Sequence, residues 1–247
     1  MAAEAWLRQG ATALWACAGG PPPFPRNLNR LWRYGLQAKL CCVSRLTLSV
    51  VAEHVRQLQL PAIPAEPDRR LRGCLVVGRE RPHIFLDTGD PEDEQRLTLA
   101  HEIAHLWLEV MEPRDRVREY LGERALEVLG GLRDPSAAER LHATLLHVPL
   151  RRPFHLLERD AEYGLACEWT RVAEERADRL ALELLAPEDE ALRRLPVAGL
   201  PFSEWLEQAT ATLIQEFDLP PLPAHGYARR LAPTVGARPS FWERFSS

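Results

Sequence analysis

Lysine is almost missing from this chain of 247 residues. Lys39 is the only one, so arginine supplies the other 30 of the 31 basic residues, and the formal net charge is −4. No dense basic cluster stands out along the sequence, and general affinity for nucleic acid is therefore not expected. The sequence also has no run of 18 or more apolar residues, so we expect no helix that spans a membrane.

Cysteines are few, odd in number and never arranged as CxxC; they are Cys17, Cys41, Cys42, Cys74 and Cys167. This pattern favours reduced thiols in a cytoplasmic protein over a disulfide framework or a zinc ribbon. The N-terminus has Glu4 ahead of its apolar patch and lacks a basic segment, so no signal peptide is predicted. A content of 46% hydrophobic and 27% charged residues is typical of a globular protein.

Helical patterns dominate the chain, with one β-rich stretch among them. Residues 46–61 predict an amphipathic helix that ends at Pro61, with His54 on or near its apolar face as a core or rim histidine rather than a metal ligand. Residues 71–78 and 83–87 predict a β-hairpin of undetermined register. The stretch LNRLWRYGLQAKLCC is interpreted as a short helix.

The strongest helix start precedes the central motif. Asp90 is a suitable N-cap, Pro91 suits the first helical position, and three acidic residues follow near the positive end of the helix dipole. Further helices are predicted over 114–129, 136–148, 168–186 and 203–217. Three regions result: an N-terminal extension (1–42), a central domain (43–187) with a helical insert (112–160), and a Pro-rich helical segment (188–247).

Residues 101–105 read HEIAH, which has the HExxH form of a metal-binding helix. Positions i and i+4 lie on one helix face, so His101 and His105 can reach one ion. Neutral imidazoles suit zinc, and Glu102 on the neighbouring edge can reach a water held at such an ion. The same histidines could instead line the polar side of a core helix, so the interpretation requires a third ligand.

The third ligand must come from another element, because no further histidine follows at the spacing of a single-motif site. Glu174 and Asp178 lie four apart on the helix predicted over 168–186, and small Ala177 and Ala181 on that helix would allow close packing. One carboxylate would bind the ion and the other would accept the remaining ring N–H of a ligating histidine. Glu175 is the next choice of ligand, and a solvated acidic face is the alternative interpretation.

The sequence over 44–187 resembles the ImmA/IrrE family of zinc metallo-endopeptidases. The resemblance rests on the leading helix, the hairpin that ends in HIFLD, the stretch RLTLAHEIAHLWLE and the closing helix EERADRLALELLAP. It departs from the family in Leu180, where an aromatic residue is usual, in Ala186, where methionine is usual, and in the length of 112–160. The implied fold is α+β: a mostly helical zincin-like core with a small antiparallel sheet or hairpin packed on the HExxH helix.

The same resemblance implies roles for individual residues. His101, His105 and Glu174 would bind Zn²⁺, Glu102 would be the catalytic acid and base, and Asp178 stands at the family's Asn/Asp position. The implied substrate is a specific protein, such as a helix-turn-helix transcriptional repressor encoded nearby, cleaved in a stress response or on induction of a mobile element.

The oxyanion donor, the function and the insert 112–160 each have more than one interpretation. An oxyanion donor could be His155 or Tyr163, which lie closest to the ligand helix, with His142, His147 and Tyr120 as further candidates. A non-catalytic zinc-binding module is the alternative function, and a fourth protein ligand such as Cys167 would favour it. The insert 112–160 could be a lid, a dimer surface, a substrate-specific arm or an autoinhibitory cover.

Overall fold

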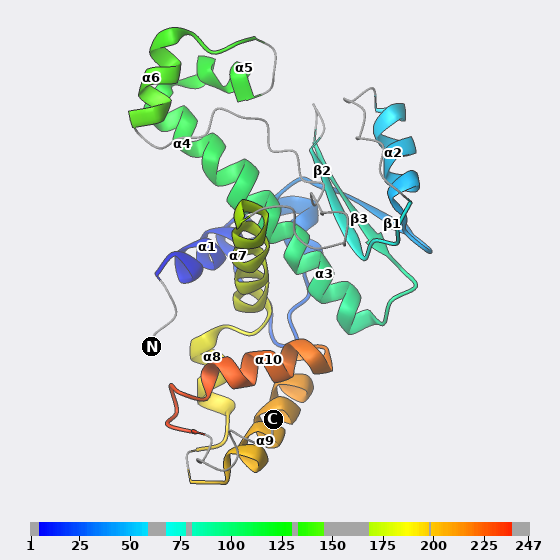
Figure 1. The fold of residues 1–247 in the computed structure, drawn as a ribbon, viewed down its shortest axis with the longest axis vertical. Helices are drawn as coiled ribbons and strands as arrows, with labels where there is room; N and C mark the ends of the chain where they lie inside the picture. Colours follow the sequence, from blue (N-terminus) through cyan, green and yellow to red (C-terminus); the bar gives the residue numbers. More distant parts are fainter. Residues whose placement is uncertain are drawn as a thin grey trace. The chain divides into compact units, whose positions relative to one another are not determined.

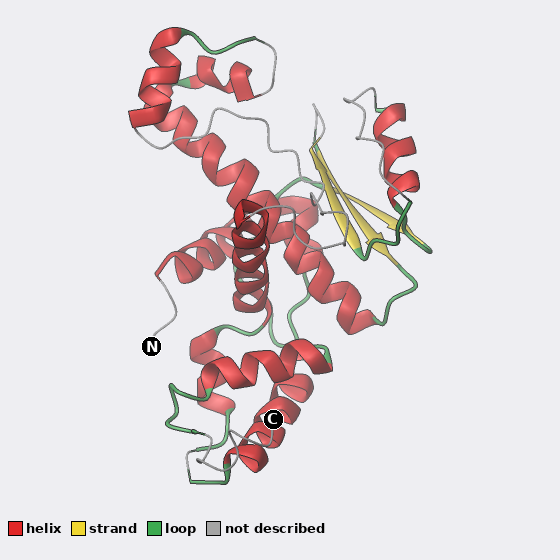
Figure 2. Ribbon diagram, viewed as in Figure 1, coloured by secondary structure: helices red, strands yellow, loops and turns green. Residues whose placement is uncertain are grey.

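A computed structural model describes residues 5–58, 68–77, 81–129, 133–145, 168–197 and 199–238, the side chains of 168–170 excepted. The fold is α+β, as predicted, with many helices and one small sheet (Figure 2). The chain divides into two compact units. One comprises Met1–Leu36, Asp90–Ala100 and Asp178–Ser247, and the other comprises Gln37–Gly89 and His101–Ala177.

The sheet of the second unit has three strands: β1 (Lys39–Val43), β2 (Gly73–Val77) and β3 (Pro82–Asp87), in the order β1-β3-β2 (Figure 1). Strands β2 and β3 form the predicted antiparallel hairpin, and its register pairs Gly73 with Leu86 and Val77 with Pro82. Strand β1 runs parallel to β3, so the sheet is mixed rather than purely antiparallel.

The helix predicted over 28–42 is wrong for most of its length. Only Leu31–Gly35 is helical, as a single π turn (η1), and Lys39–Val43 is strand β1. Lys39 pairs with His83, 44 positions later, and Val43 with Asp87. Because this parallel pairing is non-local, the apolar spacing of the segment itself gave no sign of it.

Helix α2 (Leu48–Gln57) confirms the amphipathic helix predicted there and covers one face of the sheet. Its apolar side and the loops around it share one core with the strands. The members are Leu46, Leu48, Val51, Val55, Leu71, Cys74 and Phe85. This core joins α2 to the sheet.

Helix α3 (Glu92–His105) begins one residue later than predicted, and the carbonyl of Pro91 accepts the first helical hydrogen bond, from the backbone N–H of Gln95. The chain then continues without a break through a π-helical segment, η2 (Leu106–Met111), into α4 (Glu112–Leu121). Ala100, Ile103 and Ala104 on this helix are fully buried. The HExxH residues therefore lie on a long, firmly packed helix.

The described part of the insert is helical, in agreement with the pattern. It contains α4, a 3-10 turn η3 (Glu123–Ala125), α5 (Leu126–Leu129) and α6 (Ala137–Leu145). Buried Val117, Ala125 and Leu129 form a small core of their own. Arg133 joins the pieces through ion pairs with Glu127 and Glu139. Residues 146–160 of the predicted insert lie outside the described residues.

The other unit contains α1 (Ala5–Cys17), α8 (Glu188–Arg194), α9 (Phe202–Phe217) and α10 (Pro221–Leu231), with the second half of α7 (Glu168–Leu185). Helices α7 and α9 match the predicted ones, whereas α1, α8 and α10 were not individually predicted. Two side chains bind the end of α7: Arg26 donates to the carbonyl of Leu184 at 2.7 Å, and the Tyr227 hydroxyl donates to that of Ala186 at 2.8 Å.

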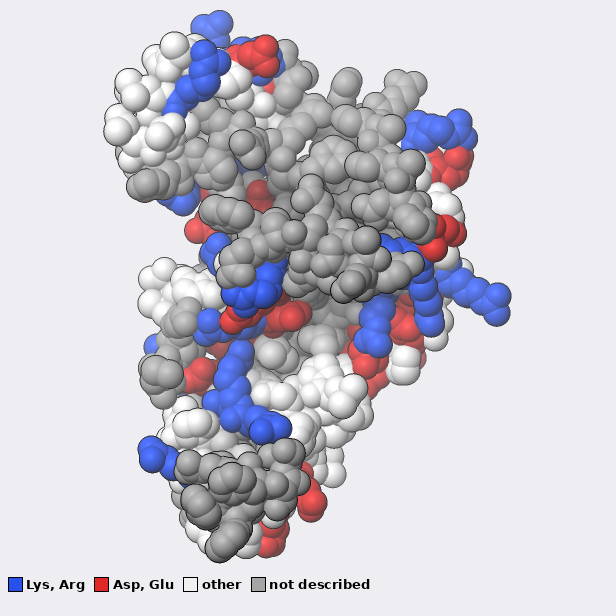
Figure 3. Space-filling view, in the orientation of Figure 1, with Lys and Arg blue, Asp and Glu red and all other residues white. Residues whose placement is uncertain are grey.

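Surface charge on the described residues is mixed in sign. Figure 3 shows acidic and basic side chains interspersed on the face that it presents. No helix within the described ranges is long and apolar enough to cross a membrane.

Asp87, at the end of β3, is fully buried and holds three neighbouring groups. It accepts hydrogen bonds from the backbone N–H groups of Arg45 and Gly89 at 3.0 and 2.8 Å, and the Arg70 guanidinium pairs with it at 3.0 Å. Burial opposes its charge, but these donors together lower the pKa of the carboxyl group. Asp87 therefore ties the loops after β1 and β3 to the start of β2.

We predict that Asp87→Ala lowers the free energy of unfolding by about 2–3 kcal/mol, because it leaves buried N–H donors without an acceptor. Asp115→Ala is the control: Asp115 is exposed and pairs with Arg118 at 2.8 Å, a surface ion pair with a contribution of about 0–1 kcal/mol. Urea unfolding of both variants measures the difference. Equal losses of unfolding free energy in the two variants would contradict the role of Asp87 as the acceptor for these buried donors.

His83 on β3 is buried without a hydrogen-bond partner for its Nδ1 among the described residues. Its ring lies edge-on to His54 of α2 at 5.2 Å between centroids, and His54 lies edge-on to Phe85 at 4.8 Å. Burial, with repulsion from His54 and Lys39, lowers the pKa of His83 to about 4. His54 is half-buried, which fits the predicted core or rim position, but its Nε2 has no hydrogen-bond partner among the described residues.

A depressed histidine pKa makes stability depend on pH. Between the unfolded pKa near 6.5 and the folded value, the unfolded chain binds more protons, so stability is full above pH 6.5 and falls as the pH drops toward 4. We predict that the stability difference between wild type and His83→Phe changes by up to about 3 kcal/mol from pH 7 to pH 4. His142→Phe, at an exposed position of α6, is the matched control; denaturation curves at both pH values test the pair.

Candidate metal centre

His101 and His105 lie one turn apart on α3 and project from the same face of the helix, as their spacing predicts. Their Nε2 atoms are 3.0 Å apart, and the two rings meet edge to face at 4.6 Å between centroids. His105 is 4% exposed. The packed inner face of the helix holds both imidazoles in place, since Ile103 and Ala104 between them have no exposed surface.

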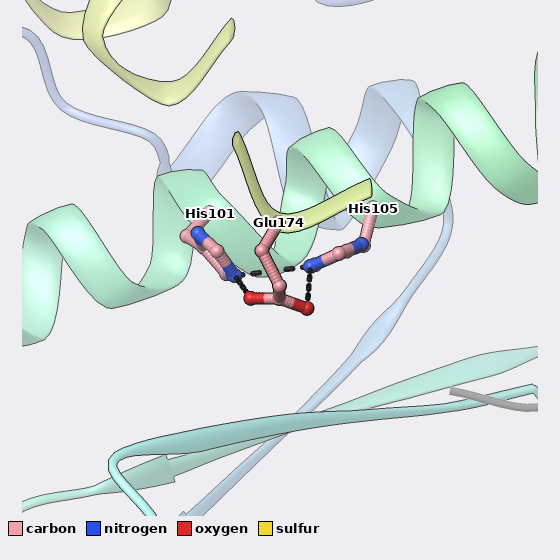
Figure 4. A group of neighbouring side chains, drawn as sticks. All are labelled: His101, His105 and Glu174. Atoms are coloured by element: carbon pink, nitrogen blue, oxygen red, sulfur yellow. Dashed lines mark hydrogen bonds and ion pairs between the residues drawn. The ribbon is translucent and has the colours of Figure 1, made fainter. Parts of the chain in front are cut away.

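Glu174 completes the group from the first half of α7 (Figure 4). One carboxylate oxygen lies 3.2 Å from Nε2 of His101, and the other lies 3.2 Å from Nε2 of His105. Ala177 and Ala181, the next small residues of α7, are fully buried. The chain thus brings together three potential ligands, two of them 69 positions or more from the third.

The donor atoms have the spacing that one ion requires. Zinc ligands lie at roughly 2.0–2.2 Å from the metal, so two of them at a tetrahedral angle are about 3.3 Å apart. The separations of 3.0 and 3.2 Å are close to this value. Two imidazoles and one carboxylate also form a donor set typical of catalytic zinc sites, so the residues fit a divalent metal. The cluster is a candidate His-His-Glu metal site.

Glu109 is a member of the site that the sequence interpretation missed. It lies one turn beyond His105, within the π segment η2, and its Oε1 is 2.6 Å from Nδ1 of His105. The carboxylate therefore contacts the ring nitrogen that faces away from the cluster. The signal that could have revealed it is the i to i+4 spacing of His105 and Glu109.

Glu102 is 8% exposed and lies between the two histidines in the sequence. Burial raises the pKa of its carboxyl group, and the two nearby imidazoles oppose the effect. Burial and the charge of Glu102 both raise the pKa of the Cys74 thiol on β2. A partly desolvated carboxyl group beside a metal position is suited to proton transfer.

The charges of the cluster support one another. Burial favours neutral His105, but hydrogen bonds to Glu109 and Glu174 outweigh it and raise the pKa of His105 to about 9. Burial likewise opposes the charge of Glu174, yet hydrogen bonds to His101 and His105 lower its pKa to about 2. The low pKa keeps Glu174 ionised, and its carboxylate supplies the negative charge that a bound cation would need.

The remaining predicted residues fall into two groups. Glu175, the alternative ligand, is exposed and pairs with Arg171 at 3.3 Å, whereas its neighbour Glu174 faces the histidines. Asp178 is exposed one turn beyond Glu174, and its predicted orienting role stays a prediction. Tyr120 and His142 are exposed on α4 and α6. The other candidates lie outside the described residues: His147, His155, Tyr163 and Cys167.

Comparison with known proteins gives one match. Residues 54–127 match the model of the M78 peptidases, described as an IrrE N-terminal-like domain. The matched range contains the hairpin and the HExxH helix but ends before α7. Searches of curated proteins and of solved structures gave no match.

We predict that His105→Ala and Glu174→Gln each reduce the bound metal by at least about tenfold at limiting metal concentration, because each removes one of three ligands. Glu175→Gln is the matched control on the adjacent residue and should retain the wild-type metal content. Elemental analysis of the dialysed proteins provides the measurement. Loss of metal in the Glu175 variant, but not in the Glu174 variant, would move the third ligand to Glu175.

Proposed function

We propose that this chain, whose residues 54–127 belong to the M78 (ImmA/IrrE) family of metallopeptidases, is a zinc-dependent endopeptidase that hydrolyses a specific protein substrate. The observation that carries the proposal is the convergence of Glu174 on the HExxH histidines. The family match ends at residue 127, so this convergence is independent support from a different part of the chain.

His101, His105 and Glu174 would hold the metal, and the proposed metal is zinc because two imidazoles and a carboxylate suit it. A zinc ion there would lower the pKa of a water molecule and polarise the scissile carbonyl group.

Glu102 would act as the catalytic acid and base. Its carboxylate accepts a proton from the attacking water, and the protonated group then donates that proton to the nitrogen of the leaving amine. Two features of its position support this role: it follows a proposed ligand directly, and its burial raises its pKa. A raised pKa makes the carboxylate a stronger base toward the attacking water.

The composition of the cluster favours an enzyme over a non-catalytic zinc module. Within the part of the chain that the structure describes, three groups of the metal-binding type converge, not four. Catalytic zinc sites have three protein ligands and one open position, whereas structural sites use four. A purely structural site also has no use for a buried carboxylic acid beside the metal.

For the substrate we propose a helix-turn-helix transcriptional repressor encoded nearby, cleaved in the cytoplasm during a stress response or the induction of a mobile element. The support for the substrate is the resemblance to the ImmA/IrrE family. The support for the compartment is that the cysteines within the described residues, Cys17, Cys41, Cys42 and Cys74, are free. Free thiols agree with a reducing compartment.

We predict that Glu102→Gln retains the metal but lowers the rate of peptide cleavage by about 10²–10⁴-fold, the usual contribution of a general acid–base group. Purified zinc-loaded protein, incubated with a proteome-derived peptide library, would yield new termini that mass spectrometry counts. The control is Glu119→Gln, the same substitution at an exposed position of α4.

The same variants separate the two functions. Cleavage by Glu102→Gln at the wild-type rate would refute the assigned mechanism, and no cleavage by the wild type with full zinc content would favour the binding module. X-ray absorption of the zinc-loaded protein adds a second criterion: three protein ligands with one water-derived oxygen support the enzyme, and four protein ligands oppose it.

A further inference from the structure

We infer that Glu109 is a positioning residue of the metal centre, which holds His105 in the one tautomer and ring orientation that can bind the ion. The inference rests on the proposed function, because it assigns Glu109 a task toward the metal that His101, His105 and Glu174 would hold. Glu109 lies outside the HExxH motif, so the motif assigns it no role.

The contact is short and directional. Oε1 of Glu109 lies 2.6 Å from Nδ1 of His105, whereas Nε2 of the same ring lies 3.0 Å from His101 Nε2 and 3.2 Å from Glu174 Oε1. One ring nitrogen thus meets the Glu109 carboxylate, and the other meets the ligand atoms of the cluster. The two ends of the imidazole have different partners and therefore different tasks.

Proton placement follows from these partners. A carboxylate only accepts hydrogen bonds, so the contact with Glu109 requires a hydrogen on Nδ1 of His105. In the neutral ring the lone pair then lies on Nε2, which points toward His101 and Glu174. A metal ion needs that lone pair, and a charge-assisted hydrogen bond to Nδ1 also increases the basicity of the ligating nitrogen.

The backbone explains why Glu109 can make this contact. It lies in η2, where Leu106, Leu108 and Val110 are buried and fix the π turn. The Glu109 side chain is only 16% exposed, so its carboxylate stays against the ring, and few water molecules can compete for the hydrogen bond at Nδ1. Single π turns inside α-helices are frequent at functional sites, and here the π segment begins directly after His105.

Glu109 and Glu174 contact the same imidazole in different ways. Glu174 lies at the Nε2 side together with His101, so it belongs to the ligand group itself. Glu109 lies at the Nδ1 side, out of that group, and would act on the metal through His105. Removal of Glu109 should therefore weaken metal binding without abolishing it, in contrast to removal of Glu174.

The test compares full-length wild type with Glu109→Gln, Glu109→Ala and the control Glu119→Gln, which lies exposed on the same continuous helix. Zinc affinity is measured by competition with a chromophoric chelator. We expect Glu109→Ala to bind zinc about 10–100-fold more weakly, the usual loss when an outer partner of a ligating histidine is removed. Glu109→Gln keeps an acceptor but loses the charge, so its affinity should lie between those of wild type and Glu109→Ala.

A second readout separates positioning from simple packing. The Co²⁺-loaded proteins report the ligand field directly, so the visible absorption bands should shift in both Glu109 variants and stay unchanged in Glu119→Gln. Thermal melting of the metal-free proteins shows whether each variant folds. If Glu109→Ala does not fold, Glu109→Gln, which is close in shape to the native residue, still tests the inference.

The outcomes separate this inference from the proposed function. Zinc affinity within about twofold of wild type and unchanged Co²⁺ bands in both Glu109 variants would overturn the inference alone, provided that the wild type binds zinc and cleaves peptides. If the wild type binds no zinc, the proposed function fails, and the role of Glu109 fails with it.

Discussion

The approach of two imidazole nitrogens to 3.0 Å is the constraint on which the rest of the centre depends. Two lone pairs cannot face each other at that distance, so either a hydrogen on one of the nitrogens or a metal ion must lie between or beside them. Glu174 contacts both nitrogens, and its carboxylate would compensate the charge of a metal ion there. The buried face of α3 and the contact between Glu109 and His105 both help to keep the two nitrogens at this distance.

The hydrophobic core provides the rigidity that the constraint requires. Ala100, Ile103 and Ala104 are fully buried on α3, and Leu106 at the start of the π segment is buried as well. In the sheet, Cys74 and Phe85 belong to the core shared with α2. The charge of Glu102 raises the pKa of the Cys74 thiol. Small movements of the helix would separate the donors, and close packing on both sides opposes them.

Local patterns predicted the parts of the fold and of the candidate site that local interactions determine. The HExxH helix, α2, the β2–β3 hairpin and α7 follow from spacing and turn residues, and the small residues of α7 indicated that Glu174 could approach the histidines. Strand β1 could not be predicted, because its partner lies 44 residues away and parallel pairing leaves no turn signal. Glu109 was missed because the orienting carboxylate was sought only on α7, and a π turn has no recognisable sequence pattern.

The centre is therefore assembled from one local and one distant part. His101, Glu102, His105 and Glu109 lie within nine consecutive residues, so a single helix brings them together as soon as it forms. The orientation of His105 then depends on a contact within that helix, and not on the docking of another element. Glu174 arrives with α7, which must pack first, so the third donor is present only in the folded chain. Metal affinity should consequently depend on tertiary packing through Glu174 and on local geometry through Glu109.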